Sequence, residues 1–356
     1  MASLSNIKTV ARYEAKTLRR SWFFRLFSIG SLFIFTMMNI GMFSPVGNEG
    51  WEVISIPSSL PLINLYLLNI AQAIVVIFLA ADFLKRDKKL DTNEVLYTRS
   101  MSNFEYVIGK SWGILRLFLS LNLLILAICL VINIISKSMS INISAYLYYL
   151  LIISVPTIIF SLGLSFTLMS LLKNQAITFL ILLGYAALDI FYLYFKAGSV
   201  FDYMAFGLPV FKSGIIGFDN LSEIINQRLI YLFAGLSLIM STILLFKRLP
   251  QSRVHRILTI ILLFVFLAGS VICSINTYST YKKGVTDKRL AIETNREYEN
   301  KKFASVTNAS IEFIHRGNSF EATTVLEISN DNSDPLSQYY FSLNPSLTVS
   351  KISSYD

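Results

Sequence analysis

Asp189 is the clearest charged residue inside an apolar segment of this chain. Asp189 follows "GYAAL" and precedes "IFYLYFK", so a helix that crosses a membrane here would carry an acid among hydrophobic neighbours. At the centre of a bilayer a charge costs about 2.5–3.5 kcal/mol on insertion scales, and it costs less near the interface. Two interpretations follow: Asp189 is a carboxylate on a substrate path, or it is an interfacial acid that Lys196 or water neutralises.

Three amide side chains share an earlier apolar segment. Asn64, Asn69 and Gln72 could hydrogen-bond between helices, because buried amides in membranes find partners across helix contacts. Such contacts could lie at a subunit interface. The alternative is that these amides line a polar conduit, and the sequence leaves both interpretations open.

Patterns typical of metalloenzymes and nucleotide-binding proteins do not occur in the sequence. His255 and His315 are isolated, HExxH and CxxC are missing, and Cys129 and Cys273 lie in apolar segments where buried thiols are expected. Gly109–Ser111 reads GKS but lacks the upstream glycine of a phosphate-binding loop. We therefore expect no catalytic residue and no metal site, and we expect that the chain is not an enzyme by itself.

The composition is typical of a membrane protein. Of 356 residues, 54% are hydrophobic and 15% are charged, whereas soluble domains carry about 25% charged residues. We expect an all-α polytopic membrane protein. The segments long and apolar enough to span a bilayer are Leu26–Phe43, Leu60–Phe83, Gly113–Ser136, Ala145–Leu172, Ala176–Phe195, Leu229–Phe246 and Ile257–Ile275, of which the first and sixth are the shortest.

Basic residues predict the orientation of these spans. The net charge is +9, and the cations lie beside apolar segments, which indicates topogenic signals rather than nucleic-acid binding. The N-terminus, the segment 84–110 and the loop 247–256 would then be cytoplasmic, and the C-terminal part would lie outside. A basic cluster at 282–289 departs from this rule, which is weak for segments that lead into long translocated domains.

Residues 1–25 form an amphipathic segment ahead of the first span. As a helix, it places apolar residues on one face and cations opposite: Ile7, Val10, Ala11 and Leu18 against Lys8, Arg12, Lys16 and Arg19. This pattern predicts a helix along the inner leaflet with its cations near anionic lipid headgroups. The alternative is that these charges only set the topology.

The outer segment 196–227 is too apolar for a plain loop and too short for a spanning hairpin. Glycines and a proline, among them Gly207 and Pro209, divide it into short apolar pieces. Such pieces enter a membrane only where protein or water satisfies their backbone groups. We predict a re-entrant hairpin that forms an outer gate, and a loop lying on the surface is the competing interpretation.

Two helix-capping signals lie in the charged segment "RDKKLDTNEVLYTRSMSNFEYVIGK". Asp91 with Glu94 predicts a short helix over Thr92–Tyr97, and Ser102 with Glu105 predicts the start of a helix that continues into the third span. The two caps favour two short ordered helices on this surface rather than an unstructured connecting loop.

At these residues the segment resembles the cytoplasmic signature of ABC type-2 transporter permeases, roughly RD…T.E.LYSRP.S…Y..GK. The resemblance covers about residues 1–250 and includes the amphipathic helix, six spans and the broken outer loop, although Met101 stands where the family often has proline. In that family this region contacts a separate ATPase and transmits its closure to the membrane helices. By position, the coupling residues implied are Arg86, Asp87, Thr92, Glu94, Tyr97, Arg99, Ser102, Tyr106, Gly109 and Lys110.

The composition changes after the seventh span. Residues 277–302 predict a polar linker helix, and 303–356 alternate apolar and polar residues over about four strands, which indicates a small extracytoplasmic β unit. The unit resembles the first strands of the N-terminal domain of zinc aminopeptidases of the aminopeptidase N type, which some bacterial proteins fuse to a type-2 permease. Because HExxH is missing, we expect an N-terminal fragment or a docking remnant, without peptidase activity.

The resemblance implies a permease domain at 26–250 with six membrane spans and residence in a bacterial inner membrane, and hydropathy predicts a seventh span at 251–276. The expected function is the permease subunit of an ATP-driven exporter, with ATP acting through the partner and no cofactor bound directly. Expected partners are a cytoplasmic ABC ATPase subunit, a second permease copy or paralogue, and membrane lipids, but no nucleic acid. The alternative is a membrane anchor or scaffold for an extracytoplasmic aminopeptidase-like domain without transport. A secondary transporter ranks third, because inverted repeats and paired intramembrane charges are missing.

Overall fold

The chain forms two compact units, Met1–Lys282 and Lys283–Asp356. The structure is a computed structural model that describes residues 4–42, 58–81, 101–136, 141–210, 218, 220–246, 253–316, 319–344 and 347–354.

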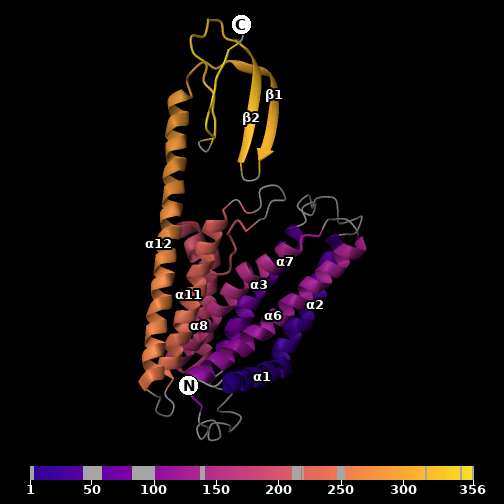
Figure 1. Cartoon of the computed structure of the whole chain (residues 1–356), viewed down its shortest axis with the longest axis vertical. Coiled ribbons are helices and arrows are strands. Elements are labelled where there is room, and N and C mark those ends of the chain that lie inside the picture. The colour runs from indigo at the N-terminus through magenta and orange to yellow at the C-terminus, as the bar shows by residue number, and fades with distance from the viewer. Residues whose placement is uncertain are drawn as a thin grey trace. The chain divides into compact units, whose positions relative to one another are not determined.

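Helices make up the first unit (Figure 1). Among the described residues, seven helical segments are long and apolar enough to cross a membrane, which confirms the predicted number of spans. After α1 (Leu4–Arg20), the spans are α2 (Trp22–Met42), α3 (Ser59–Ala81), α6 (Asn103–Ser136), α7 (Ile143–Tyr149) with η2 (Leu150–Ser154) and α8 (Val155–Leu172), α9 (Gln175–Leu188) with η3 (Asp189–Leu193) and α10 (Tyr194–Ala197), α11 (Leu221–Leu245), and α12 (Arg253–Tyr298).

Several helices extend beyond the apolar segments that predicted them. α6 begins at Asn103 rather than at Gly113, and α11 begins at Leu221 rather than at Leu229, so the prediction that the sixth span is short was wrong. The first turns of α11 contain Gln227 and Arg228, which are buried by protein. Hydropathy marks the part of a helix that faces lipid, and it misses polar turns that other helices cover.

The start of α6 has the predicted capping box. The Ser102 backbone N–H donates to Glu105 Oε2 at 2.7 Å, and the Glu105 N–H donates to Ser102 Oγ at 3.2 Å. These reciprocal bonds satisfy backbone donors that the first helical turn leaves without partners. The other predicted cap, Asp91 with Glu94, lies outside the described residues.

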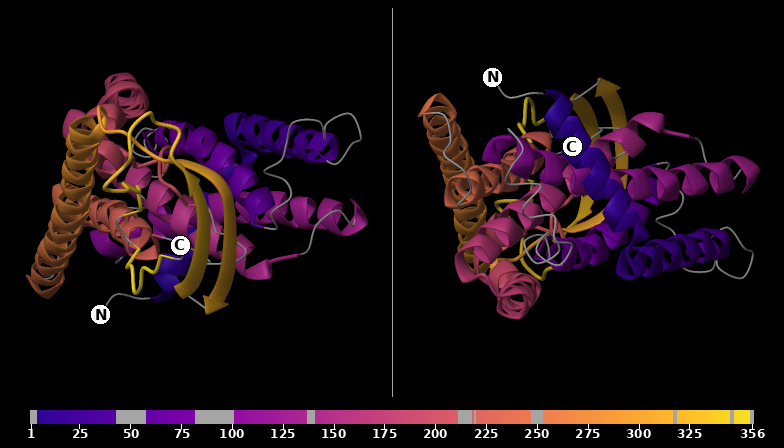
Figure 2. Two further views of the ribbon diagram at one scale, coloured as in Figure 1. Left: turned by 90° about the horizontal axis from the view of Figure 1, so that it is seen from above. Right: turned by 90° about the horizontal axis from the view of Figure 1, so that it is seen from below.

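α1 lies across one end of the helix bundle and packs against α6 (Figure 2). A Cβ atom added at Gly113 would come within 2.7 Å of the Ala11 carbonyl oxygen, so only glycine permits this approach. Glu14 pairs with Lys110 at 3.5 Å, and both side chains are almost fully buried, at 3% and 4% exposed. The Lys110 Nζ also lies 5.0 Å above the Tyr106 ring.

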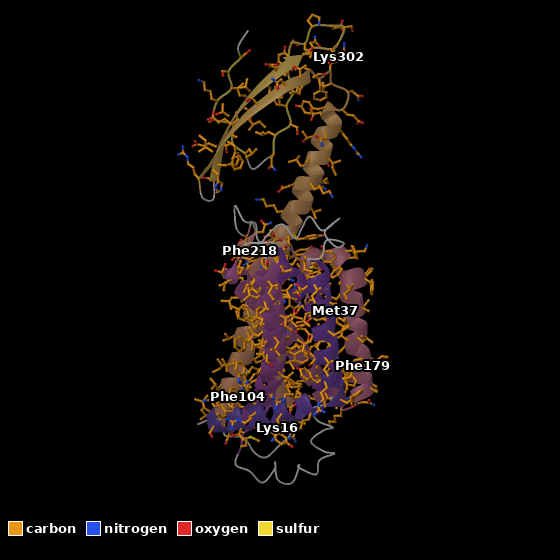
Figure 3. The ribbon with its side chains drawn as sticks, turned by 90° about the vertical axis from the view of Figure 1, so that its right-hand side faces the viewer. Lys16, Met37, Phe104, Phe179, Phe218 and Lys302 are labelled. Atoms are coloured by element: carbon orange, nitrogen blue, oxygen red, sulfur yellow. The ribbon has the colours of Figure 1, made fainter. Side chains whose placement is uncertain are left out.

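The amphipathic pattern of α1 is confirmed. Ala11 and Leu18 are buried in the unit, whereas Lys8, Arg12, Lys16 and Arg19 are exposed. The apolar face is therefore covered by α6, and the cationic face is left free for other contacts. Lys16 of α1 lies at the same end of the unit as Phe104 of α6, and Phe218 lies at the opposite end (Figure 3).

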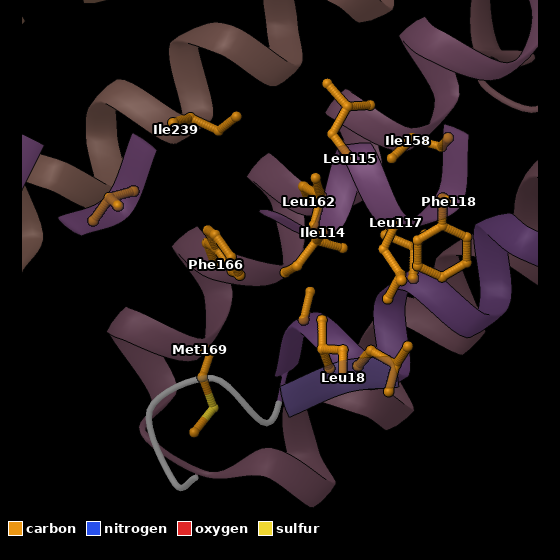
Figure 4. Packing of buried hydrophobic residues seen from close by; sticks show 14 of the residues in the cluster. Leu18, Ile114, Leu115, Leu117, Phe118, Ile158, Leu162, Phe166, Met169 and Ile239 are labelled. Atoms are coloured by element: carbon orange, nitrogen blue, oxygen red, sulfur yellow. The ribbon is translucent and has the colours of Figure 1, made fainter. Parts of the chain in front are cut away.

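The main hydrophobic cluster joins α1, α6, α8 and α11 (Figure 4). Leu18, Phe118, Phe166 and Ile239 are among its members. α8 and α11 come especially close, because a Cβ added at Gly163 would lie 2.4 Å from the Gly235 carbonyl oxygen. Small residues at such crossings let helix backbones approach in a membrane.

The second unit contains the end of α12 and an antiparallel hairpin of β1 (Ser305–Arg316) and β2 (Ser319–Ser329). Tyr340 packs on Tyr298 and Phe303, with ring centroids 5.2 and 6.1 Å away. The predicted linker helix and the seventh span form one continuous helix, α12, so the expected boundary near 276 is not observed.

The prediction of about four strands was wrong for the described residues. Residues 339–344 and 347–354 alternate in polarity but pair with no strand. A strand exists only where a neighbour accepts and donates its ladder hydrogen bonds, and alternation alone does not supply that neighbour.

The close contact of α8 with α11 generates a first prediction. Gly163→Val should destabilise the protein by about 1–3 kcal/mol or more, because the new side chain overlaps the backbone of α11. Gly184→Val is the matched control, because nothing lies within 4 Å of a Cβ at Gly184. Thermal unfolding in detergent should show a lower Tm for Gly163→Val only, and equal Tm values for the two variants would contradict the packing argument.

Candidate functional site

The centre of the candidate site is a buried arginine. Arg228, in the second turn of α11, is only 3% exposed. Its guanidinium donates from Nε to the Ile152 carbonyl at 2.7 Å, from Nη2 to the Ile153 carbonyl at 3.0 Å and to Thr157 Oγ1 at 2.7 Å, and from Nη1 to the Tyr203 carbonyl at 3.2 Å. The rigid fork of donors thus joins α11 to the span α7–α8 and to the loop after α10.

The sequence of the fourth span explains why the Ile152 carbonyl is free to accept a hydrogen bond from Arg228. Pro156 has no backbone N–H, so it cannot donate to the Ile152 carbonyl four residues earlier. The preceding turn, η2, is a π-helix in which the Val155 N–H donates to Leu150 five residues back. A π-turn interrupts the regular hydrogen-bond ladder, and such turns frequently occur at functional sites. Arg228 Nε donates to the Ile152 carbonyl in place of the N–H that Pro156 lacks.

The loop 198–210 has little regular structure, yet side chains from the spans satisfy its carbonyl groups. It begins with a 3-10 turn, η4 (Gly198–Phe201), and Asp202–Ala205 are buried. The donor–acceptor pairs are Asn69 to Met204, Gln227 to Ser199 and Asp202, Tyr231 to Val200, Tyr194 to Gly207, and Tyr66 to Phe206. This is the condition under which irregular backbone is tolerated at membrane depth.

Asp202 fixes a tight turn in this loop. Its carboxyl oxygens accept from the backbone N–H groups of Phe206 at 2.6 Å and Gly207 at 2.7 Å. The turn holds Ala205 at φ 58°, a left-handed conformation that residues other than glycine rarely adopt. Burial raises the pKa of Asp202, while the two N–H donors and the nearby Arg228 oppose that rise.

A chain of amides and hydroxyls extends from the loop into the bundle. Asn69 donates to Thr157 Oγ1 at 3.1 Å and accepts from Gln72 at 3.0 Å. Asn122 of α6 donates to Gln72 at 2.7 Å and accepts from Ser154 at 2.8 Å. Four spans therefore share one hydrogen-bonded network in which each buried amide has a partner.

A separate amide pair lies near this network. Asn39 of α2 and Asn64 of α3 exchange two side-chain hydrogen bonds, of 2.7 and 3.0 Å. The Asn64 amide also approaches Cys129 Sγ at 3.6 Å. Asn39 is absent from the residues that the sequence singled out, because one asparagine in an apolar segment gives no sign of its partner.

Asp189 begins the second π-helix, η3, and is 1% exposed. It accepts from the Tyr203 backbone N–H, while its Oδ1 has no hydrogen-bond partner among the described residues. Among the described residues no ion pair joins it to Lys196, which is exposed. The structure therefore does not support neutralisation by Lys196.

The other residues predicted for a substrate path or gate have distinct environments. Asn64, Asn69 and Gln72 are fully buried and hydrogen-bonded within one chain. Gly207 lies against Tyr194, whose ring atoms would be 2.0 Å from an added Cβ. Pro209 is exposed. A gate at these positions stays a prediction, and so does the re-entrant hairpin, since residues 211–217 and 219 lie outside the described part of the chain.

Four of the expected ATPase-coupling residues are described, and they organise the start of α6. Ser102 forms the capping box, Gly109 lies against Val10 of α1, and Lys110 pairs with Glu14. Tyr106 stacks on Phe246 with ring centroids 5.2 Å apart. The remaining positions lie outside the described residues: Arg86, Asp87, Thr92, Glu94, Tyr97 and Arg99.

Sequence reasoning missed Arg228, Gln227 and Asn122. Gln227 and Arg228 stand directly before the apolar run 229–246 and look like boundary residues. Pro156 inside the fourth apolar segment was the one available signal, because a proline in a membrane helix frees a carbonyl that another side chain must satisfy.

Comparison with known proteins does not assign the chain to a family. No family model matches it, and a search of curated proteins gives no match. The class defined by fold and site is a multi-pass helical membrane protein with a buried polar network.

The geometry of Arg228 generates a second prediction. Arg228→Met should destabilise the protein by about 3–5 kcal/mol, because the Ile152, Ile153 and Tyr203 carbonyls each lose one buried donor. The Tm of Arg228→Lys should lie between that of Arg228→Met and that of wild type, because one ammonium group cannot reproduce the forked contacts of the guanidinium. Tm in detergent is the measurement, with the exposed Arg116→Met as control. A wild-type Tm for Arg228→Met would refute the assignment.

The amide pair generates a third prediction. Asn39→Leu and Asn64→Leu should each lower stability, since each leaves one buried amide without its partner. The double variant should be more stable than the sum of the two losses predicts, with a coupling energy of about 0.6–1.7 kcal/mol. A double-mutant cycle from unfolding in mixed micelles measures this energy. Combining Asn39→Leu with Thr167→Val is the control, and strict additivity of both cycles would exclude the pair.

Proposed function

We propose that this chain is the membrane-spanning permease subunit of an ATP-driven exporter, coupled through its segment 84–110 to a separate cytoplasmic ATPase. The observation that carries this proposal is the course of α6. One unbroken helix of 34 residues begins within the expected coupling segment, at Asn103, and carries Asn122 of the buried polar network. A displacement at its start is therefore transmitted to the network, since a helix moves as a rigid element.

The start of α6 is joined to two other helices. The buried pair Glu14–Lys110 and the Gly109 contact attach it to α1. Asn103 Nδ2 donates to the Phe246 carbonyl at 2.7 Å, which attaches it to the end of α11. α11 carries Arg228 near its other end. The start of α6 is therefore connected to the loop 198–210 through α11 as well.

The distance between the two regions suits a transmembrane coupling. Asn122 lies 19 residues after Asn103 in the numbering of α6, which is about 28 Å along a helix axis. In the proposed orientation the α1 end is cytoplasmic and the loop 198–210 is at the outer side of a bacterial inner membrane. A second copy or paralogue would complete the path, and the exposed cations of α1 would face anionic lipid.

A second candidate function is supported by the hairpin of the other unit. One face of β1–β2 is apolar and exposed, and it includes Ile311, Phe313, Phe320 and Leu326. An uncovered apolar face indicates an interaction site. This observation favours a membrane anchor or scaffold for an extracytoplasmic aminopeptidase-like domain, in which case segment 84–110 would be dispensable.

A fourth prediction separates the two functions. A photo-crosslinking amino acid at Arg99 should capture a polypeptide with a Walker A motif in native membranes, and one at Phe206, in the loop 198–210, should not. Glu94→Ala should abolish this capture, because the proposed contact loses a charged partner, whereas Glu223→Ala in the first turn of α11 should retain it. Capture is read by mass spectrometry.

Absence of any ATPase at Arg99 would overturn the exporter proposal. Capture of a peptidase from Ile311, together with no product from Arg99, would favour the anchor. Equal capture from Arg99 and Phe206 would show that the contact is nonspecific.

A further inference from the structure

Three charged side chains are buried together near the loop 198–210. Asp189, Asp202 and Arg228 are each at most 3% exposed, and Arg228 lies within electrostatic reach of both acids. Two potential negative charges thus share one guanidinium. Because a net charge in a buried cluster is strongly disfavoured, one of the two acids should be neutral.

The hydrogen bonds of the two acids differ. Asp202 has a backbone N–H donor at each oxygen, which suits an ionised carboxylate, since that form only accepts. Asp189 receives the Tyr203 N–H, and its Oδ1 has no donor among the residues that the structure describes. An ionised Asp189 would leave this oxygen unsatisfied, whereas a proton on the carboxyl group removes the charge.

A second buried polar atom without a partner belongs to the same cluster. The Tyr203 hydroxyl oxygen has no hydrogen-bond partner in the described part of the chain, and its ring stacks on Tyr185 with centroids 5.5 Å apart. Tyr185 and Asp189 are four residues apart, so they share a side of the fifth span. The titratable and charged groups that interact with Asp189 are Tyr185 from its own span, Asp202 and Tyr203 from the loop, and Arg228 and Tyr231 from α11, while the uncharged Phe160 of α8 packs on Tyr203.

We propose that Asp189 is an intramembrane proton-binding site that carries an exchangeable proton when the loop 198–210 is held as described. The ligand is a proton because Asp189 is almost fully buried and the Tyr185 and Tyr203 rings beside it are stacked, with centroids 5.5 Å apart. Loss of the proton places a second negative charge against the Tyr203 backbone, so the protonation state acts directly on the loop. This site is independent of any ATPase.

The first test uses a carbodiimide, which reacts with protonated carboxyl groups in apolar surroundings. Purified wild-type protein in detergent should be labelled at Asp189 by dicyclohexylcarbodiimide, and labelling should decrease as the pH rises. Asp189→Asn should remove the labelled peptide, and Asp202 should stay unlabelled. Labelling of Asp202 in place of Asp189 would overturn the assignment.

A second measurement does not depend on access of the reagent. If Asp189 is protonated, Asp189→Asn replaces it with a neutral group of the same shape and should keep or raise the Tm, whereas Asp202→Asn should lower it. The folded state holds a proton that the unfolded state releases, so wild-type stability should fall with rising pH relative to Asp189→Asn. A loss of Tm in Asp189→Asn equal to that in Asp202→Asn would overturn the proposal.

Sodium chloride and choline chloride distinguish a proton from a metal cation. Equal labelling in the two salts is expected for a proton site. Protection by sodium alone would overturn the proposal in favour of a sodium site. These outcomes are separate from the crosslinking of an ATPase, so either proposal can fail without the other.

Discussion

The central constraint on the membrane unit is the need to satisfy every buried backbone carbonyl without water. Pro156 and the π-turn η2 interrupt the hydrogen-bond ladder of the fourth span, and Arg228 of α11 donates to the Ile152 and Ile153 carbonyls there. A guanidinium in an apolar interior is unfavourable unless all its N–H groups have acceptors. The interrupted helix of the fourth span and the buried guanidinium of Arg228 are therefore each destabilising alone. They are compatible only when α8, α11 and the loop 198–210 are assembled together.

This mutual dependence explains why the two ends of the unit differ. Near α1 the helices meet largely through apolar side chains such as Leu18 and Phe166, together with the single buried pair Glu14–Lys110. Near the loop they meet through amides, hydroxyls and Arg228. Apolar packing has no directional requirement, so it tolerates small shifts. Hydrogen-bonded networks have few allowed arrangements, and a shift exchanges one set of partners for another. The polar end is thus the part suited to discrete states.

The sequence predicted the spans because each span has its own signal. A run such as Leu60–Phe83 is apolar wherever it lies, and Ser102 with Glu105 caps a helix through contacts three residues apart. The network could not be predicted in the same way. Asn122 belongs to the network only through its hydrogen bonds to Gln72 and Ser154, which lie on other helices. Nothing in its local sequence distinguishes it from a lipid-facing asparagine. The strands expected at 339–354 failed for a related reason, because a strand also requires a partner that its own sequence does not specify.

The same reasoning explains how the hairpin of the second unit came to have one apolar face. Along β1 the apolar residues Ile311 and Phe313 alternate with polar ones, and their partners on β2, Thr324 and Ala322, continue that face. The register shift between Val306 and Asn308 inserts one residue, which turns Val306 onto the side of Ile311. Without the bulge, Val306 would lie among the polar residues of the opposite face. A bulge that extends an exposed apolar surface lowers the solubility of an isolated hairpin, so its presence is best explained by a surface that another polypeptide covers.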